Sequence, residues 1–220
     1  MNTHTRARGR GFARALAATS LSAVAIAAAA PAAASAPTTP DTVTVNAQRH
    51  VLAGTRVRTA GALASKRSGQ TVLLQLSQGR GWKTIDRVKT RAGGRYAAFF
   101  TPKSVRRYGV RVRTLDGSAT RVLEGGVTAY RRSAASWYGP GFYGRRTACG
   151  RTLGRGTLGV AHKSLPCGTR VQFRYRGRTV TAPVIDRGPY AAGREYDLTA
   201  ATKQRLRFGS TGTVWSSPRS

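Results

Sequence analysis

The stretches Val160-Ala-His-Lys-Ser-Leu-Pro-Cys-Gly168 and Val184-Ile-Asp-Arg-Gly-Pro189 decide the fold of this chain. With Ala135-Ser-Trp-Tyr-Gly139, Thr147-Ala-Cys-Gly150 and Asp197-Leu-Thr199 they make up one unit, residues 135–217. The unit holds both cysteines of the chain, one of its three histidines and three of its seven carboxylates. The rest of the sequence offers Arg, Ala and Gly with little reactive chemistry, so we expect any functional site to lie in this unit.

Alternating residues in this unit predict β-strands. Residues 169–175 and 178–185 alternate, and the dipeptide Arg176-Gly177 between them predicts a tight hairpin. The segment 200–206 predicts a short helix that opens after Thr199 and ends at a glycine cap, Phe208-Gly209. Residues 213–215 predict a last strand, and His162 is expected in a loop.

The preceding segment, residues 44–130, also reads as β-structure. Short period-two runs are separated by Gly turns every 8–15 residues, a pattern that favours a small antiparallel sandwich. Pieces such as Gly81-Trp82-Lys83 resemble immunoglobulin-like modules, and the segment has no cysteine pair. We expect it to space the second domain or to bind a surface. Residues 131–134 are expected to form a hinge.

The first 36 residues predict a secretory signal peptide. A basic region with four arginines precedes an apolar run, and small residues with Ala-x-Ala patterns follow. The run is short and weakly apolar for a transmembrane anchor. Residues 37–43 are then a linker. No cysteine lies near this segment to take a lipid. We therefore expect a secreted or cell-wall-associated protein with no membrane anchor after cleavage.

The net charge is +31, from 38 basic and 7 acidic residues. Removing the four signal arginines leaves 38 − 4 = 34 basic residues and a charge of 34 − 7 = +27. Such a charge predicts an anionic partner. The basic residues are spread along the chain in short runs, without a zinc-finger or helix-turn-helix pattern. Anionic cell-wall polymers therefore fit better than nucleic acid.

Cys149 and Cys167 form an even pair in a chain expected to be exported, so a disulfide is the default reading. It would close a loop of about 18 residues and contribute roughly 3 kcal/mol to stability. The alternative is a metal-binding pair, with His162 as the other soft ligand of the unit. Our prediction is the disulfide, with no metal and no cofactor.

The five motifs, in this order, resemble the rare lipoprotein A (RlpA) family of septal lytic transglycosylases, which is related to expansins and barwin. The resemblance covers residues 135–217. It implies an all-β, six-stranded double-psi β-barrel with one short helix and a groove for a β-1,4-linked glycan, here the glycan strands of peptidoglycan. The implied reaction is lytic transglycosylation with an anhydro-muramyl product.

Two carboxylates have both a chemical and a structural interpretation. Asp186 ends an apolar strand before a tight turn, where a partly desolvated carboxyl suits general-acid work. It could equally cap the turn or pair with Arg187. Asp197 could support the start of the short helix. The resemblance implies that Asp186 is catalytic, and in expansins and related endoglucanases an Asp in the place of Asp197 is the acid facing the glycan.

Other residues of the unit are candidates for contact with a glycan. The resemblance places His162 in the groove, where an imidazole would hydrogen-bond an Asp or a sugar hydroxyl, or stabilise developing charge. Alternatively, His162 is a satisfied structural group. The remaining candidates are an arginine and four aromatic residues whose faces suit sugar rings, although Trp137 suits the core equally: Arg187, Trp137, Tyr138, Tyr190 and Tyr196.

One position departs from the family. Transglycosylases of this type usually carry a Glu just after the Thr-Ala-x-Gly string, where this chain has Arg151. Arginine cannot exchange a proton near neutral pH. The departure favours an alternative, an expansin-like module that binds or loosens wall glycan without cutting it. A third reading, an inhibitor of barwin type, rests on fold resemblance alone.

Overall fold

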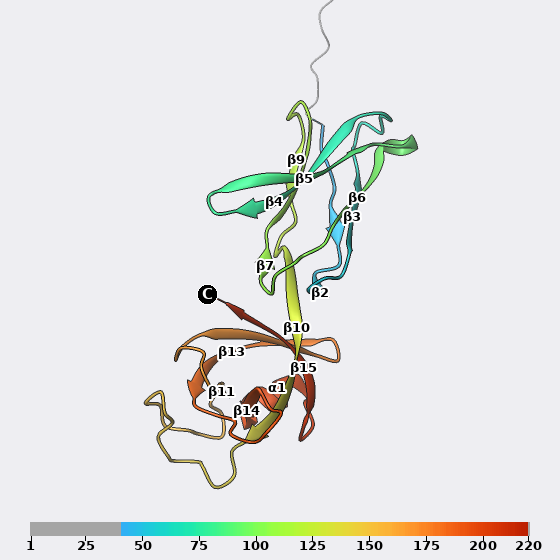
Figure 1. Ribbon diagram of the computed structural model, residues 1–220. Helices are drawn as coiled ribbons and strands as arrows, with labels where there is room; N and C mark the ends of the chain where they lie inside the picture. Colours follow the sequence, from blue (N-terminus) through green and yellow to red (C-terminus); the bar gives the residue numbers. More distant parts are fainter. Residues whose placement is uncertain (1–40, 220) are drawn as a thin grey trace, which may run out of the picture. The chain divides into compact units, whose positions relative to one another are not determined.

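A computed structural model of the chain describes residues 41–219, so the predicted signal peptide and most of the predicted linker lie outside the described residues. Among residues 41–219, no helix has the length and apolar character needed to span a membrane. The elements are almost all strands (Figure 1). They are β1 Asn46–Ala47, β2 His50–Leu52, β3 Val57–Ala62, β4 Thr71–Gln78, β5 Gly81–Lys89, η1 Ala92–Gly94, β6 Arg95–Phe100, β7 Arg107–Tyr108, β8 Val110–Thr114, β9 Thr120–Val122, β10 Val127–Tyr138, β11 Val160–His162, β12 Arg170–Tyr175, β13 Arg178–Asp186, β14 Tyr196–Thr199, α1 Ala200–Leu206 and β15 Gly212–Arg219.

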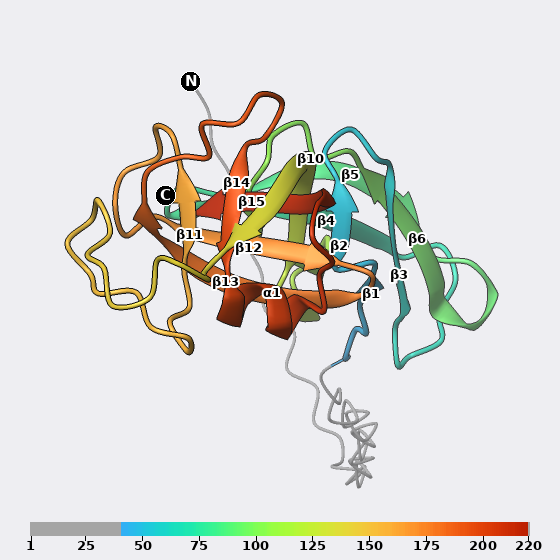
Figure 2. The same cartoon turned by 90° about the horizontal axis from the view of Figure 1, so that it is seen from below.

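The C-terminal part is a closed six-stranded barrel. The strands pair in the order β14-β11-β13-β12-β15-β10, and β14 also pairs with β10, which completes the ring. Two of the six pairings are parallel, β10 with β14 and β11 with β13, and the other four are antiparallel. Figure 2 shows these strands crossing around a common centre. The ring leaves none of its own strands with a bare edge along its whole length.

Alternating side chains fill the barrel. The core holds Phe173, Tyr196, Leu198, Leu206 and Val214, among others, and all five are essentially inaccessible to solvent. The hairpin predicted at Arg176-Gly177 is present: both residues have positive φ, 44° and 82°, as a type I′ turn between β12 and β13 requires. Sequence alternation therefore located these two strands correctly.

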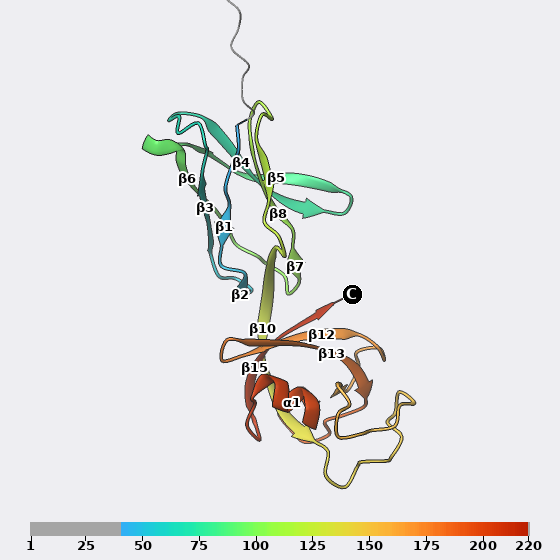
Figure 3. The ribbon, with the colours of Figure 1, turned by 180° about the vertical axis from the view of Figure 1, so that it is seen from behind.

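Helix α1 begins as expected and ends differently. Thr199 is its N-cap, and the Thr199 side chain accepts a bond from the Thr202 N–H at 3.4 Å. The left-handed residue at the other end is Arg207 (φ 51°), not a glycine, and the Phe208 N–H bonds back to Lys203 at 3.0 Å. Leu206 and Phe208 both enter the barrel core, so packing holds an ordinary side chain in the left-handed conformation. Figure 3 shows the helix beside the barrel strands.

Three expectations for this part are corrected. The predicted hinge, residues 131–134, lies inside the continuous strand β10, where Arg131–Ala134 pair with Ser216–Thr213 of β15. His162 is the last residue of strand β11 and not a loop residue. Strand β14 was also missed, and its last residue, Thr199, leads directly into α1.

Most strands of residues 41–126 form two antiparallel sheets, β1-β3-β6 and β5-β4-β8-β9, and the remaining strands β2 and β7 pair with the first residues of β10. Residues of both sheets share one apolar core that includes Val57, Leu74, Phe100 and Val112. The strands follow the predicted alternating runs, and Gly69, Gly79 and Gly117 have positive φ at turns. That this part is an immunoglobulin-like sandwich stays a prediction.

Candidate functional site

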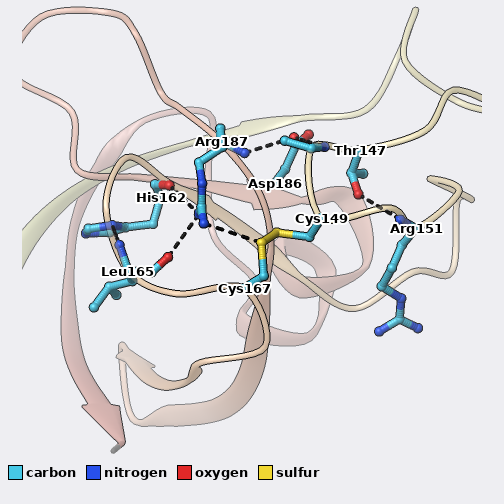
Figure 4. Close-up of a disulfide and its surroundings, with 9 residues drawn as sticks. Thr147, Cys149, Arg151, His162, Leu165, Cys167, Asp186 and Arg187 are labelled. Carbon is cyan, nitrogen blue, oxygen red and sulfur yellow. Dashed lines mark hydrogen bonds between the residues drawn. A yellow bond between two sulfur atoms is a disulfide. The ribbon is translucent and has the colours of Figure 1, made fainter.

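A disulfide links two loops of the barrel, which confirms the predicted pairing. Cys149 and Cys167 are bonded, with their Cα atoms 5.7 Å apart (Figure 4). Cys149 lies in the long loop between β10 and β11, and Cys167 lies in the loop between β11 and β12. The disulfide therefore fixes the first of these loops beside the end of β13, where the Cys149 N–H bonds to the carbonyl of Ile185 at 3.3 Å.

Asp186 is the last residue of β13, and its carboxylate is held by backbone groups. Oδ1 accepts bonds from the N–H of Ala148 and of Arg187, both at 2.9 Å. The side chain is partly buried. It forms no ion pair with Arg187 or with any other cation among residues 41–219. Asp186 thus does cap its turn, as one interpretation of the sequence predicted, and it is also anchored to the loop that the disulfide fixes.

Asp197 lies on the same face of the barrel as Asp186. In the register of the strands, Ala161 of β11 is opposite Asp186 of β13 on one side and opposite Asp197 of β14 on the other. Two strand spacings of about 4.8 Å place the two Asp Cα atoms roughly 10 Å apart. Side chains from this separation can converge on one ligand.

The carboxyl of Asp197 is partly desolvated. It accepts a hydrogen bond from the hydroxyl of Ser136, its neighbour on β10. Burial raises the pKa of Asp197, opposed in part by the Ser136 bond and by the charge of Arg194. Asp197 does not cap α1, because Thr199 does. The sequence-based alternative for Asp197 is therefore wrong, and the carboxyl is free for other chemistry.

Tyr138 joins this group from β10. It lies two residues after Ser136 and so points to the same side of the strand. Its hydroxyl is buried and has no hydrogen-bond partner among the described residues. Burial raises the pKa of Tyr138, and the nearby charges of Asp186 and Asp197 raise it further. The phenol therefore lies near both carboxyl groups with an unused polar atom.

His162 occupies a different environment from the two Asp residues. Its Nδ1 accepts bonds from the N–H of Ser164 and of Leu165, at 3.1 and 2.9 Å. The imidazole is 8% exposed, and its centroid lies 4.8 Å from that of Tyr196. Burial lowers the pKa of His162, although the Glu195 charge opposes this. These contacts make His162 a group that fixes the loop after β11, and its catalytic role stays a prediction.

Tyr196 cannot contact a sugar as predicted. Its side chain is fully buried in the barrel core, with the edge of Phe173 at a centroid distance of 5.0 Å. The alternation of β14 turns Tyr196 inward and Asp197 outward. The prediction is wrong because it counted an aromatic residue without assigning it to a face of the strand.

The other predicted contact residues differ in how accessible they are. Arg187 donates to the carbonyls of His162 and Leu165, at 3.2 and 2.9 Å, and also lies 3.3 Å from the sulfur of Cys167 (Figure 4). It thus ties the β11–β12 loop to the turn after Asp186. Trp137 is partly buried beneath Lys203, and Tyr190 is 83% exposed. Of these three, Tyr190 is the most available to a ligand.

Arg151, at the position of the departure from the family, is exposed. Its backbone N–H and C=O both bond to Thr147, at 3.2 and 2.7 Å. In Figure 4 its guanidinium points away from Asp186. The backbone of Arg151 therefore supports the loop that supplies the Ala148 N–H, while its side chain adds positive charge to the surface.

Two residues of the site were missed by sequence reasoning. Ser136 bonds Asp197, and Glu195 forms a paired contact with Arg131 while its Oε1 lies 3.8 Å from Nε2 of His162. Glu195 is one of only three carboxylates in the unit, and this scarcity was a usable signal. No group of three or more His, Cys, Asp or Glu residues within residues 41–219 has an arrangement that could hold a metal ion.

Comparison with known proteins shows which family the barrel sequence is similar to. The sequence model of a family described as "Lytic transglycolase" matches residues 131–215. Over these residues, which include most of the barrel, the chain is similar to this family. The resemblance predicted from the five motifs is confirmed, and the matched residues include Asp186, Asp197 and Tyr138.

Curated relatives carry matching names. A Synechocystis protein, "Probable endolytic peptidoglycan transglycosylase RlpA", is 37% identical over 133 residues, which are 59% of this chain and 39% of the relative. A protein of the same name from Aquifex aeolicus is 40% identical over 87 residues, 39% of this chain and 38% of the relative. The Pseudomonas aeruginosa "Endolytic peptidoglycan transglycosylase RlpA" is 41% identical over 89 residues, 39% of this chain and 26% of the relative. The chain thus spans less than half the length of these relatives.

Proposed function

We propose that this protein is an exported, peptidoglycan-active lytic transglycosylase. Its substrate would be the β-1,4 bond between N-acetylmuramic acid and N-acetylglucosamine. The observation that carries the proposal is the placement of Asp186 and Asp197 on one face of a lytic transglycolase domain, flanking Ala161, with the Tyr138 hydroxyl near both. The names of the relatives support the same substrate and reaction.

In this mechanism Asp186 donates a proton to the glycosidic oxygen. The C1–O bond of the muramic residue breaks, the glucosamine leaves with a new 4-hydroxyl, and positive charge develops at C1. The muramic 6-hydroxyl then bonds to C1 and returns its proton to the Asp186 carboxylate. No activated water is needed, so the carboxylate spacings of hydrolases do not apply strictly. The backbone N–H groups of Ala148 and Arg187 hold the acid in place through Oδ1, and Oδ2 accepts no hydrogen bond from the described residues.

Asp197 and Tyr138 support this step from the neighbouring strands. The Asp197 carboxylate, when ionised, stabilises positive charge at C1. The Tyr138 hydroxyl, with no partner among the described residues, is free to donate to a sugar oxygen or to a carboxylate. Tyr190, highly exposed and four residues after Asp186, offers a ring face to a sugar. These roles rest on position and accessibility.

The proposal is tested on purified peptidoglycan. The protein and its Asp186→Asn variant are incubated with it, and the soluble products are analysed by mass spectrometry. General-acid catalysis contributes about 10²–10⁴-fold, so we expect at least a 100-fold loss of anhydro-muramyl ends with the variant. The matched control is Asp116→Asn. Asp116 is an exposed turn residue 70 positions before Asp186 in the sequence and outside the barrel, so this variant should keep full activity. Equal cleavage by Asp186→Asn would show that this mechanism is wrong.

The alternative is a non-catalytic, expansin-like module that binds or loosens the wall. The exposed Arg151 and the high positive charge favour it. The same incubation decides between the two. Absence of soluble products, with co-sedimentation that persists in several hundred millimolar salt, identifies a glycan-binding module. Binding that disappears at such salt is electrostatic attachment to anionic wall polymers.

We also propose that residues 44–130 are an accessory immunoglobulin-like domain and that the protein acts outside the membrane, at the cell wall. The shared core of the two sheets and the exposed, basic surface residues support a spacer or surface-binding role. A protein shortened to residues 131–220 is expected to keep cleavage of soluble glycan and to lose binding to whole walls.

A further inference from the structure

A pocket lies on the lytic transglycolase domain, beside α1. Its volume is about 430 Å³, within the usual range for small-ligand sites. The end of β10, the loop that follows it and the helix build the walls. The lining residues are Trp137, Pro140, Gly141, Tyr143, Arg155, Ala200, Lys203 and Gln204. None of them belongs to the group around Asp186 and Asp197.

The pocket is separate from the carboxylate pair because of the strand geometry. Trp137 and Tyr138 are successive residues of β10, so their side chains point to opposite faces. Tyr138 points toward Asp186 and Asp197, and Trp137 points toward α1. A ligand in the pocket would therefore not occupy the carboxylate site.

Two cations in the pocket are each held over an aromatic ring. The Lys203 ammonium lies 3.8 Å from the ring centroid of Trp137, and the Arg155 guanidinium lies 5.1 Å from that of Tyr143. The Tyr143 ring is itself packed on the backbone: a Cβ at Gly139 would lie 2.6 Å from its hydroxyl oxygen. Cation–π contact orders both long side chains without using their N–H donors.

Both cations keep their hydrogen-bonding capacity. Within residues 41–219, neither Lys203 nor Arg155 forms a salt bridge or donates a side-chain hydrogen bond. A Lys ammonium has three donors and an Arg guanidinium has five. The surrounding loop adds Arg145, Arg146 and Arg151 and contains no carboxylate. The pocket therefore presents ordered, unpaired positive charge.

We propose that this pocket binds an oxyanion carried on a sugar ring. A carboxylate or phosphate would accept bonds from Lys203 and Arg155 together, and the guanidinium fork suits either group. A lone anion is small beside a space of about 430 Å³, and Pro140 and Tyr143 offer apolar surface for the attached ring. The site would give the positive charge of the chain a specific place of contact with an acidic polysaccharide. It does not depend on glycan cleavage.

The test is a titration, followed by NMR, with three probes that share one pyranose ring. Glucuronate presents a carboxylate, glucose 6-phosphate presents a phosphate, and glucose presents neither. We expect at least one of the anions to bind about tenfold more tightly than glucose and to shift the Trp137 indole signal. The anion that binds more tightly identifies the acidic group. Equal binding of glucose and both anions would overturn the proposal.

Variants that lose the same charge distinguish binding in the pocket from unspecific attraction by the net positive charge of the protein. Lys203→Gln is expected to weaken anion binding about fivefold to tenfold, and Lys203→Arg to retain it. Arg205→Gln, two residues away on the same helix and exposed, loses the same charge outside the pocket. Equal weakening by Arg205→Gln and Lys203→Gln would show unspecific attraction. Asp186→Asn should bind the anion normally, so failure of the proposed cleavage and failure of this site are distinguishable.

Discussion

Replacing both cysteines by serine should destabilise the barrel by about 3 kcal/mol. The disulfide spans 18 residues, and the chain-entropy relation gives about −10.7 cal/mol/K for a loop of this length, or about 3.2 kcal/mol at 25 °C. The barrel and the preceding sheets belong to one compact unit joined by the continuous strand β10, and for a unit of 150–250 residues 1 kcal/mol shifts the melting temperature by about 2–4 °C. We therefore expect Cys149→Ser/Cys167→Ser to melt about 6–12 °C below the native protein.

The measurement is thermal unfolding by circular dichroism, with and without a reducing agent. The native protein under reducing conditions should match the serine variant, and the variant should not respond to reduction, because the chain has no other cysteine. A loss below about 1 kcal/mol would refute the reasoning. It would mean that Arg187 and the backbone bonds of the two loops already hold them together without the covalent link.

Three further changes test the local contacts. Because the pKa of Asp197 is raised in the folded protein, the folded state binds its proton more tightly than the unfolded state, and stability falls as the pH rises through that pKa. Asp197→Asn should therefore stabilise the protein at pH 7 and give no gain near pH 3, as measured by urea unfolding at both pH values. Gly159→Ala should lower the free energy of unfolding by about 1–3 kcal/mol, because its Cβ would lie 2.2 Å from Cδ1 of the buried Ile185. In the control Gly154→Ala, the nearest atom to the new Cβ is 3.4 Å away, and urea unfolding should show almost no change. Thr199→Ala removes the N-cap of α1 and a 2.7 Å bond to the carbonyl of Thr157, and a loss of about 1–2 kcal/mol is expected in thermal unfolding.

Alternation predicted the long strands of the barrel and missed the short ones. The runs that became β12 and β13 alternate over six or more residues around a turn with two positive φ angles. Strand β11 has three residues and β14 has four, too few to show a period. Their pairing with each other and with β13 and β10 depends on contacts distant in sequence. The hinge at residues 131–134 was wrong for a similar reason, since the adjacent, exposed Arg131 and Arg132 lie in a strand whose pairing with β15 is not visible in the local sequence.

Sequence analysis selected site residues by their chemistry, but it could not tell on which face of a strand a side chain lies. Residue chemistry and motif order predicted the disulfide and singled out Asp186 and Asp197, which lie on one face of the barrel and whose catalytic roles stay predictions. Tyr196 was misplaced because its neighbour Asp197 takes the outer face of β14, and Ser136 was overlooked because its role is visible only across the β10–β14 pairing. The helix end shows the same limit, because buried Leu206 and Phe208 place the left-handed residue at Arg207 and not at the glycine.

The disulfide holds a loop that contributes to both proposed sites. The loop between β10 and β11 supplies the Ala148 N–H that holds Asp186, and it also carries Tyr143 and Arg155 of the cationic pocket. This loop contains no long regular element, so Cys149 is its covalent anchor to the β11–β12 loop, which Arg187 in turn ties to the end of β13. Reduction should therefore loosen the acid and the pocket together. A protein built in this way depends on an oxidising compartment, and this dependence agrees with action outside the membrane, as proposed.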